Sequence, residues 1–222
     1  KAGTGKTTFL KYIKKTTKKN TVVLAPTGVA AINAGGLTIN SFFQLPFGPF
    51  VPSDSRLRTS ANGTENKETI YTTFRYKDEK REIIESLELL IIDEISMVRS
   101  DTLDVIDRIL KIFRKKPHLP FGGVQVVLIG DTFQLPPIAN TDQWDILSQY
   151  YKTPFFFSAK IIEANKPTYI ELKKIYRQSE QDFIAMLNRI RVNEVSNLDY
   201  SKLNSKYQPT FSPNGSDYIT LA

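Results

Sequence analysis

Short apolar runs alternate along the chain with stretches of helical character. The apolar runs predict three buried strands, at residues 21–25, 88–93 and 124–130. The other stretches predict helices at residues 6–19, 96–116 and 179–191. Apolar strands that alternate with helices are typical of an α/β fold with a parallel sheet and helices on both faces. Ligands of such folds bind beyond the carboxyl ends of the strands, so a site is expected there.

Residues 47–81 do not follow this alternation. They are rich in Pro, Ser, Thr, Asn and charged residues, and residues 69–74 contain β-like pieces. We therefore expect a small β-rich insertion that interrupts a main domain made of residues 1–46 and 82–175. Residues 217–222 have the character of a further strand, which stops where the chain ends.

Composition narrows the functional classes. The 222 residues include no Cys and one His, so disulfides and thiolate metal sites are excluded and a histidine metal site is not expected. No apolar run has the length of a membrane span, and we expect a cytoplasmic protein. Lys and Arg number 30 against 23 Asp and Glu, which gives a formal net charge of +7. This excess fits a polyanionic partner but does not identify one.

Residues 2–8, Ala-Gly-Thr-Gly-Lys-Thr-Thr, are typical of a phosphate-binding loop. Glycines let backbone N–H groups approach phosphate oxygens, and the N-terminus of the following helix adds partial positive charge. Lys6 would reach the β- and γ-phosphates, and Thr7 would hold Mg²⁺ through its hydroxyl group. The residues expected to bind ATP are Gly3, Thr4, Gly5, Lys6, Thr7 and Thr8. A strand normally precedes such a loop, so we also expect a longer protein that supplies this first strand.

Carboxylates follow the second apolar run. Asp93 would join the Mg²⁺ shell, and Glu94 would orient and deprotonate the attacking water, which indicates hydrolysis rather than transfer. After the third run, at the same edge of the sheet, Gln134 could hydrogen-bond both the γ-phosphate and that water. Taken singly, these segments have simpler interpretations as a glycine-rich turn, an acidic helix cap and a polar turn. Their combination favours a nucleotide site.

Two other functional classes stay open at this point. One is a P-loop kinase or another small-molecule phosphotransferase, which Glu94 disfavours because a carboxylate there activates water. The other is a non-catalytic DNA-binding module with a vestigial nucleotide site, which the intact set of polar residues disfavours. ATP hydrolysis stimulated by single-stranded DNA would decide against the phosphotransferase.

Five segments carry a resemblance to a known family. Residues 130–137, Gly-Asp-Thr-Phe-Gln-Leu-Pro-Pro, resemble motif III of superfamily-one DNA helicases. The segment at 120–125 resembles the signature of the Pif-one branch, 25–31 with 38–43 resemble motif Ia and its extension, and 175–178 resembles motif IV. The match keeps the family order from residue 1 to about residue 191. It is closest to bacterial Pif-one proteins and their RecD relatives.

The resemblance implies a RecA-like P-loop fold and the first motor domain of an ATP-driven DNA helicase. It implies ATP and Mg²⁺ as cofactors, 5′-to-3′ movement on single-stranded DNA, a forked duplex as partner, and a monomer. Residues 47–81 would be the wedge that separates the strands, and residues 176–222 would begin the second motor domain. Roles in DNA repair, DNA recombination and telomere maintenance, at a bacterial nucleoid, are further expectations.

Individual site residues also follow from the resemblance. Arg177 matches the arginine that reaches the γ-phosphate from the second motor domain. Segments that line the DNA groove in the family contain Thr27, Gly28, Asn40, Ser41, Phe42 and Phe43. Hydroxyl and N–H groups suit phosphates and aromatic faces suit bases, but one of the two phenylalanines is expected in the core. Family members often carry His where Asn40 stands, so a role that needs imidazole is not expected.

Five lysines at helical spacing form a basic stripe on the first predicted helix, namely Lys11, Lys14, Lys15, Lys18 and Lys19. A solvated helix face is the simpler and favoured interpretation. The alternative is a face that tracks DNA. Charge alone does not decide between the two.

Overall fold

A computed structural model describes residues 3–60, 68–176 and 180–209. The chain divides into two compact units, Lys1–Arg177 and Gln178–Ala222. The first unit contains the sheet and the predicted site. The described residues of the second form two helices.

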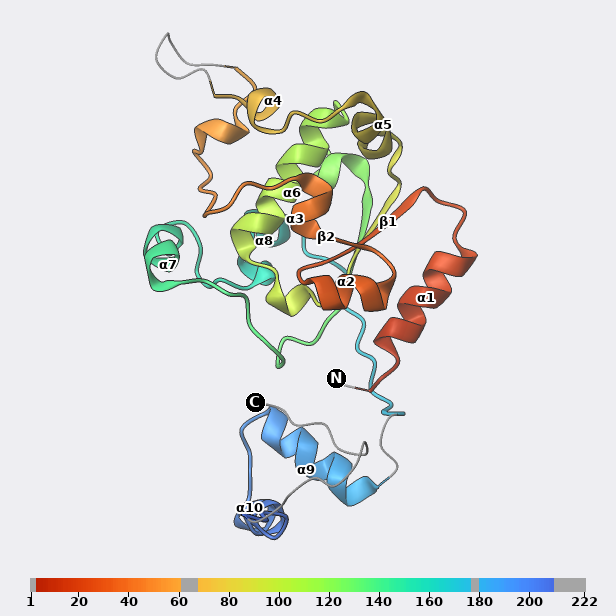
Figure 1. Ribbon diagram of the computed structural model, residues 1–222, viewed down its shortest axis with the longest axis vertical. Coiled ribbons are helices and arrows are strands. Elements are labelled where there is room, and N and C mark those ends of the chain that lie inside the picture. The colour runs from red at the N-terminus through yellow and green to blue at the C-terminus, as the bar shows by residue number, and fades with distance from the viewer. Residues whose placement is uncertain (1–2, 61–67, 177–179, 210–222) are drawn as a thin grey trace. The chain divides into compact units, whose positions relative to one another are not determined.

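The first unit is built on a four-stranded parallel sheet with the strand order β2–β1–β3–β4 (Figure 1). The strands are β1 (Thr21–Ala25), β2 (Leu37–Thr38), β3 (Leu89–Ile92) and β4 (Gln125–Leu128). The three predicted strands are therefore confirmed, although β3 and β4 are shorter than expected. Strand β2 was not predicted because two residues are too few to form an apolar run.

Helices surround this sheet. They are α1 (Lys6–Thr16), α2 (Gly28–Ala34), α3 (Ile39–Phe43), α4 (Ile70–Thr73), α5 (Asp78–Ser86), α6 (Ser100–Phe113), α7 (Thr141–Leu147) and α8 (Lys160–Ala164). Short 3-10 helices are η1 (Ser55–Leu57), η2 (Ile95–Met97), η3 (Pro120–Gly123) and η4 (Phe156–Ser158).

Two helices differ from the prediction: one ends earlier than expected, and the other is divided into two. Helix α1 ends at Thr16 because the backbone of Thr17 is extended, so the last two lysines of the basic stripe follow the helix instead of lying on it. The helix expected at 96–116 divides into η2 and α6, since Val98 and Arg99 between them have extended backbone angles.

Alternate strand side chains enter two apolar layers, one on each face of the sheet. One layer holds Leu24 and Leu90 with the apolar side of α6, and the other holds Val23 and Ile91 with Leu10 of α1. Full burial of a Leu or Ile side chain contributes about 1.5–3 kcal/mol to stability. Strand β3 is buried along its whole length, which confirms a parallel sheet covered by helices on both faces.

The insertion, predicted to be β-rich, is helical where the structure describes it. Residues 69–74, expected to contain β-like pieces, form α4 and its caps, and the described part of the insertion contains no strand. Thr69 and Thr72 form a reciprocal capping box that starts the helix. Ile70 and Phe74 lie one helical turn apart, and both enter the core. The pattern interpreted as β-like was therefore one turn of a helix.

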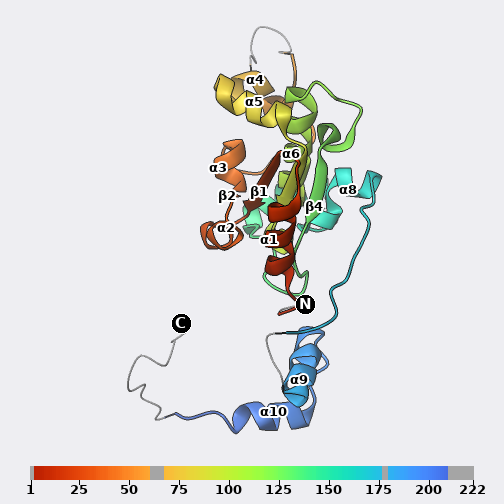
Figure 2. The same cartoon turned by 90° about the vertical axis from the view of Figure 1, so that its right-hand side faces the viewer.

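The insertion packs on the core that it shares with α6, at the end of the unit remote from the start of α1 (Figures 1 and 2). Its first residues are held by Asp101, a fully buried residue at the start of α6 that accepts the N–H of Phe50 at 3.0 Å. Arg99 pairs with the same carboxylate and donates to the carbonyl oxygen of Gly48 at 3.1 Å. The base of the insertion is thus fixed to the main domain by a buried ion pair.

Gly36 lies where the chain after α2 approaches β1. A β-carbon at this position would lie 2.1 Å from the carbonyl oxygen of Val23, which is backbone and cannot turn aside. We expect Gly36→Ala to lower the free energy of unfolding in urea by about 1–3 kcal/mol. Gly28→Ala is the matched control and should not lower it, because its added carbon meets no atom within 4 Å. Equal losses in the two variants would contradict the packing described.

The second unit contains α9 (Gln181–Arg191) and α10 (Asn197–Asn204), so the helix predicted at 179–191 is confirmed from Gln181 onward. Arg189 donates to both carboxylate oxygens of Asp199, at 2.5 and 2.8 Å. These bonds, with those from Ser196, hold the pKa of Asp199 well below its ordinary value. The strand predicted at 217–222 lies outside the described residues. In both units, the described helices lack the length and apolar character that crossing a membrane requires.

Candidate nucleotide-binding site

The loop before α1 has the backbone shape that its sequence predicts. Gly3 and Gly5 have φ angles of 68° and 85°, in the left-handed region that glycine adopts without steric cost. Gly5 is the N-cap of α1, so the first N–H groups of the helix adjoin the loop and lack intrahelical partners. A helix N-terminus approached through glycines is suited to bind phosphate.

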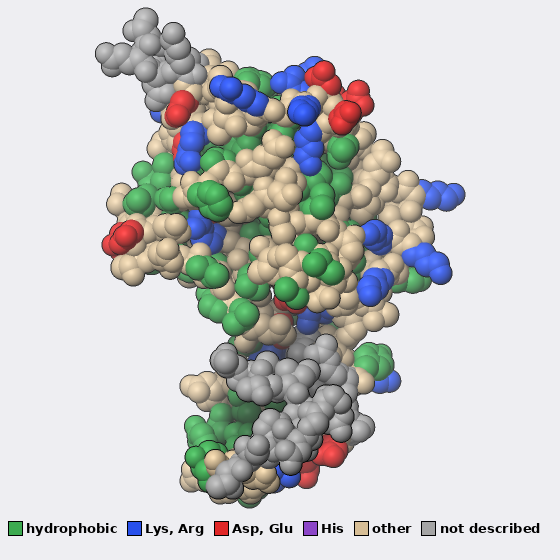
Figure 3. Space-filling model, in the orientation of Figure 1, with side chains coloured by type: hydrophobic (Ala, Val, Ile, Leu, Met, Phe, Trp, Pro, Cys, Tyr) green, Lys and Arg blue, Asp and Glu red, His purple; other side chains and the backbone are tan. Residues whose placement is uncertain are grey.

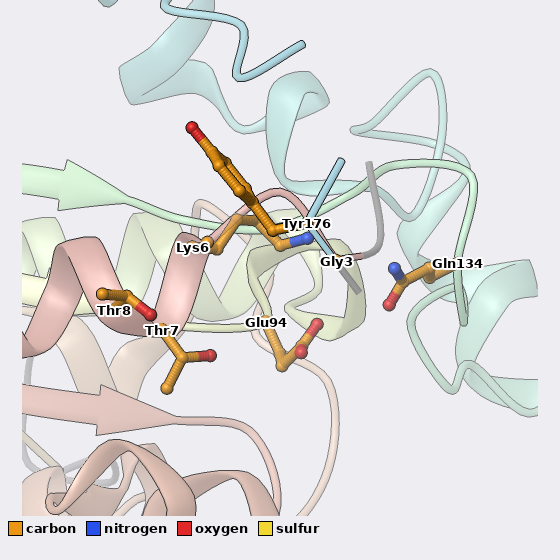
Figure 4. Close-up of a pocket in the computed structure, with 8 residues that line it drawn as sticks. Gly3, Lys6, Thr7, Thr8, Glu94, Gln134 and Tyr176 are labelled. Atoms are coloured by element: carbon orange, nitrogen blue, oxygen red, sulfur yellow. The ribbon is translucent and has the colours of Figure 1, made fainter. Parts of the chain in front are cut away.

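A cavity of about 450 Å³ opens at this loop. Its lining residues are Gly3, Gly5, Lys6, Thr7, Thr8, Glu94, Gln134 and Tyr176. Figure 4 shows the ammonium group of Lys6, the carboxylate of Glu94 and the carboxamide of Gln134 directed into the same space. They come from the start of α1 and from the segments after β3 and β4. The structure therefore brings together three side chains that the sequence predicted to share a site.

Asp93 and Glu94 follow β3, and backbone hydrogen bonds tie this segment to β1 and to the residue that follows β4. The N–H of Asp93 donates to the carbonyl oxygen of Leu24 at 2.8 Å, and the N–H of Ile95 donates to that of Ile129 at 2.9 Å. The Asp93 carboxylate accepts the N–H of Glu94 at 3.0 Å. Glu94 has a φ of 50°, a left-handed conformation that is uncommon for a residue with a side chain and concentrates at functional sites.

The surroundings of these carboxylates change their affinity for protons. Burial raises the pKa of Glu94 above its ordinary value, and the charges of Asp93 and Asp131 raise it further, while Lys6 lowers it. Burial also raises the pKa of Asp93, against the N–H of Glu94 and the charge of Lys6. A raised pKa makes Glu94 a better proton acceptor, which suits a general base.

The loop after β4 holds Gln134 beside these carboxylates. Asp131 is buried, and its carboxylate accepts the N–H of Phe133 at 3.3 Å and the side-chain amide of Gln134 at 3.4 Å. A β-carbon on Gly130 would lie 2.9 Å from the Cγ2 of Ile95 and 3.0 Å from its backbone nitrogen. The absence of a side chain at Gly130 thus lets the two loops approach each other.

Tyr176 lines the cavity although it was not among the predicted site residues. Its N–H donates to the carbonyl oxygen of Gly3 at 2.8 Å. The sequence held a signal for it, because Tyr176 precedes Arg177 in the segment that resembles motif IV. Arg177 itself lies outside the described residues. Thr4 and Asp93 are buried and do not belong to the lining of the cavity.

Four of the six predicted DNA contacts are accessible to a ligand. Gly28, Asn40 and Ser41 are exposed. Thr27 is half-buried, and its hydroxyl caps α2 by accepting the N–H of Ala30 at 3.2 Å. These residues lie at the starts of α2 and α3, which both follow strands of the sheet.

Phe42 and Phe43 are both core residues, which corrects the expectation that one of them would offer an aromatic face to DNA. These residues are 2% and 0% exposed, and their rings pack edge to face with 4.8 Å between the ring centres. Lys80 of α5 places its Nζ 3.4 Å from the centre of the Phe42 ring, and the Tyr76 hydroxyl donates to the carbonyl oxygen of Phe43 at 2.6 Å. Both covering residues stand far along the sequence, so the local pattern could not show this burial.

A parallel α/β sheet with a phosphate-binding loop and a strand–Asp–Glu segment at its carboxyl edge defines a P-loop nucleoside triphosphatase domain. The sequence model of the PIF1-like helicase family matches residues 1–200. The chain belongs to this family, and the RecA-like fold implied by its motifs is confirmed. Family membership also favours a helicase over the phosphotransferase alternative.

Relatives with known names and structures agree with this assignment. The chain is 34% identical to the ATP-dependent DNA helicase PIF1 of Saccharomyces cerevisiae over 200 residues, which cover 87% of this chain and 21% of that protein. It matches Pif1 from Bacteroides in complex with ADP-AlF3 and single-stranded DNA with a TM-score of 0.82 and 45% identity, over 96% of this chain and 46% of that one. It matches Pif1 from Candida albicans with a TM-score of 0.73 and 29% identity, over 96% of this chain and 44% of that one. The chain therefore spans less than half the length of these relatives.

Proposed function

We propose that this chain carries the first motor domain of an ATP-dependent DNA helicase that couples ATP hydrolysis to 5′-to-3′ movement on single-stranded DNA and to unwinding. The observation that carries this proposal is the convergence of Lys6, Glu94 and Gln134 on one cavity, in a chain of the PIF1-like family. In the proposed division, residues 1–46 and 82–175 form this domain, and residues 176–222 begin the second motor domain.

ATP would bind with its phosphates against the loop at residues 3–8. Lys6 brings positive charge to the β- and γ-phosphates, and backbone N–H groups bind their oxygens. Thr7 and Asp93 would hold Mg²⁺ through a hydroxyl and a carboxylate oxygen, which are hard donors that this ion prefers, and water and phosphate would be its other ligands. The described residues contain no group of three or more Asp, Glu, His or Cys side chains that could hold a metal ion, so these two residues alone would not complete the shell of the ion. Bound Mg²⁺ would neutralise charge on the phosphates.

Hydrolysis then needs a base, an oriented water and positive charge. Glu94 would take a proton from the attacking water while the oxygen of that water bonds to the γ-phosphorus and ADP leaves. Gln134 would orient that water, and Lys6 would stabilise the charge on the transferred group. Arg177, on the evidence of its motif, would add a second positive charge from the other motor domain.

Single-stranded DNA would contact the starts of α2 and α3 through Thr27, Gly28, Asn40 and Ser41. Solved relatives support this partner, because Bacteroides Pif1 is bound to single-stranded DNA in one structure. Another concerns unwinding at forked duplex DNA by two coordinating Pif1 helicases. We propose single-stranded and forked DNA as partners of this protein, a monomer as its basic unit, and the insertion as the wedge.

Glu94→Gln in the full-length protein tests the proposed hydrolysis. The amide cannot accept a proton from water, so we expect the kcat of ATP hydrolysis to fall about 10²–10⁴-fold in the presence of single-stranded DNA. Nucleotide binding, measured by fluorescence with a labelled ATP analogue, should persist. Glu82→Gln, an exposed glutamate on α5, is the matched control and should hydrolyse ATP like the parent. Near-normal turnover in the Glu94 variant would rule out this residue as the base.

A further inference from the structure

The amino-terminal part of the chain is free of acidic residues over a long stretch. The first acidic residue is Asp54, although the chain contains 23 acidic residues in all. The lysines of this stretch are concentrated in α1 and just after it. A positive field of this kind, without internal compensation, favours contact with a polyanion.

The exposed side of α1 combines lysines with an aromatic ring. Lys11 and Lys15 lie one helical turn apart, and Tyr12 is in the neighbouring row with 65% of its surface exposed. Lys18 follows the helix and is also exposed. We call Lys11, Tyr12, Lys15 and Lys18 the α1 basic face.

No lysine of the α1 basic face has an ion-pair partner within the described ranges. Figure 3 shows basic side chains gathered over α1, with no acidic side chain among them on the face drawn. After this face, the carboxylate of Glu88 accepts the N–H of Asn20 at 2.9 Å, a bond to the backbone and not to a lysine. The charge of the α1 basic face is therefore left for a ligand or for solvent.

The α1 basic face adjoins the surface proposed for DNA. Helices α1 and α2 are in contact and lie side by side (Figures 1 and 2). Lys14 of α1 donates from its Nζ to the carbonyl oxygen of Gly35, the C-cap of α2, at 2.5 Å. Helix α2 begins at Gly28, which is itself a proposed DNA contact. A single strand of DNA bound along α2 would thus lie next to the lysines of α1.

We propose that the α1 basic face is an additional contact surface for single-stranded DNA, continuous with α2, a proposal that rests on the proposed helicase function. Lysine side chains attract the phosphate backbone, and an exposed tyrosine ring stacks on a base. Stacking of this kind requires unpaired bases, so a single strand fits the face better than a duplex. The face would lengthen the footprint of the strand on the motor domain.

The full-length protein carrying Lys11→Ala and Lys15→Ala tests the phosphate contacts. We would measure the binding of a fluorescein-labelled oligothymidylate by anisotropy over a range of KCl concentrations. Loss of two phosphate contacts should reduce the slope of log K against log salt by about 1.4, at about 0.7 per contact for single strands. The matched control, Lys116→Ala with Lys166→Ala, removes two exposed lysines elsewhere and should leave the slope unchanged.

Tyr12→Ala tests the stacking contact. Loss of one stacked base should raise the Kd for the oligothymidylate about tenfold, and Tyr12→Phe should restore it, because the phenyl ring keeps the aromatic face. Unchanged ATP hydrolysis in these variants at saturating DNA would show that the site and fold are intact. As a second measurement, an oligonucleotide with 5-iododeoxyuridine should crosslink to the parent protein within α1.

The outcomes separate the two proposals. Unchanged affinity and salt slope in the α1 variants, or crosslinks confined to other segments, would overturn the α1 contact and leave the helicase function standing. If the slope fell equally for single-stranded and blunt duplex DNA, the specificity for a single strand would be wrong. Absence of any DNA binding by the parent protein would contradict the proposed function itself.

Discussion

Lys6→Ala in the full-length protein is expected to abolish ATP hydrolysis and DNA unwinding, while binding to single-stranded DNA largely survives. Lys6 opens α1 and directs its ammonium group into the cavity that Glu94 and Gln134 also enter (Figure 4). No other lysine or arginine lines this cavity in the described residues. Removal of one preorganised charge at a transferring group costs about 10²–10³ in kcat, so steady-state ATPase assays should show at least that loss.

Binding to DNA should survive the Lys6 change because none of the proposed DNA contacts, at the starts of α2 and α3 and on the α1 basic face, lines the cavity. Lys116→Ala removes an exposed lysine and serves as the matched control, with normal turnover expected. Retained unwinding by the Lys6 variant would contradict the proposed mechanism. A parallel loss of DNA binding would show that the nucleotide and DNA surfaces are not separable as described.

Asp101→Ala should destabilise the folded protein by about 3–5 kcal/mol, the cost of breaking a buried ion pair from one side. The Asp101 side chain is 0% exposed, and it accepts two bonds from Arg99, at 2.7 and 2.8 Å, and one from the N–H of Phe50. The substitution leaves Arg99, whose side chain is 14% exposed, without its counter-charge, and it leaves the N–H of Phe50 without an acceptor. Urea unfolding followed by circular dichroism measures the loss.

An exposed ion pair provides the contrast for Asp101. Lys152 and Glu163 pair at 3.0 Å with 82% and 42% of their side chains exposed, so Glu163→Ala should cost less than about 1 kcal/mol. If the two variants lose the same free energy of unfolding, Asp101 does not anchor the insertion as described. A double variant, Arg99→Leu with Asp101→Leu, should recover part of the loss, because it removes both charges together.

The sheet was predictable because its central strands are buried on both faces. A strand such as Leu89–Ile92 then appears in the sequence as a continuous apolar run. Helix α4 was not predictable in the same way, because one turn of helix and a short β-segment place apolar residues at similar spacings. Two features stabilise the helix here. Thr69 and Thr72 cap it reciprocally, and Ile70 and Phe74 are buried in the core.

The nucleotide site followed from sequence to a greater degree than the DNA surface. Lys6, Glu94 and Gln134 are placed by short segments whose spacing fixes their position at the ends of strands. The exposure of Phe42 and Phe43 instead depends on α5 and the insertion, which close over α3 from a distant part of the sequence. Aromatic residues of a short helix have no local feature that separates a base-stacking ring from a core ring.

The close approach of Gly130 to Ile95 has a consequence for how the two loops at the cavity can change. Any side chain at position 130 would displace the backbone next to Glu94, since the nitrogen of Ile95 is 3.0 Å from the added carbon. The backbone beside the proposed general base and the loop that bears Gln134 therefore share one mechanical constraint, because a side chain added in one loop pushes on the other.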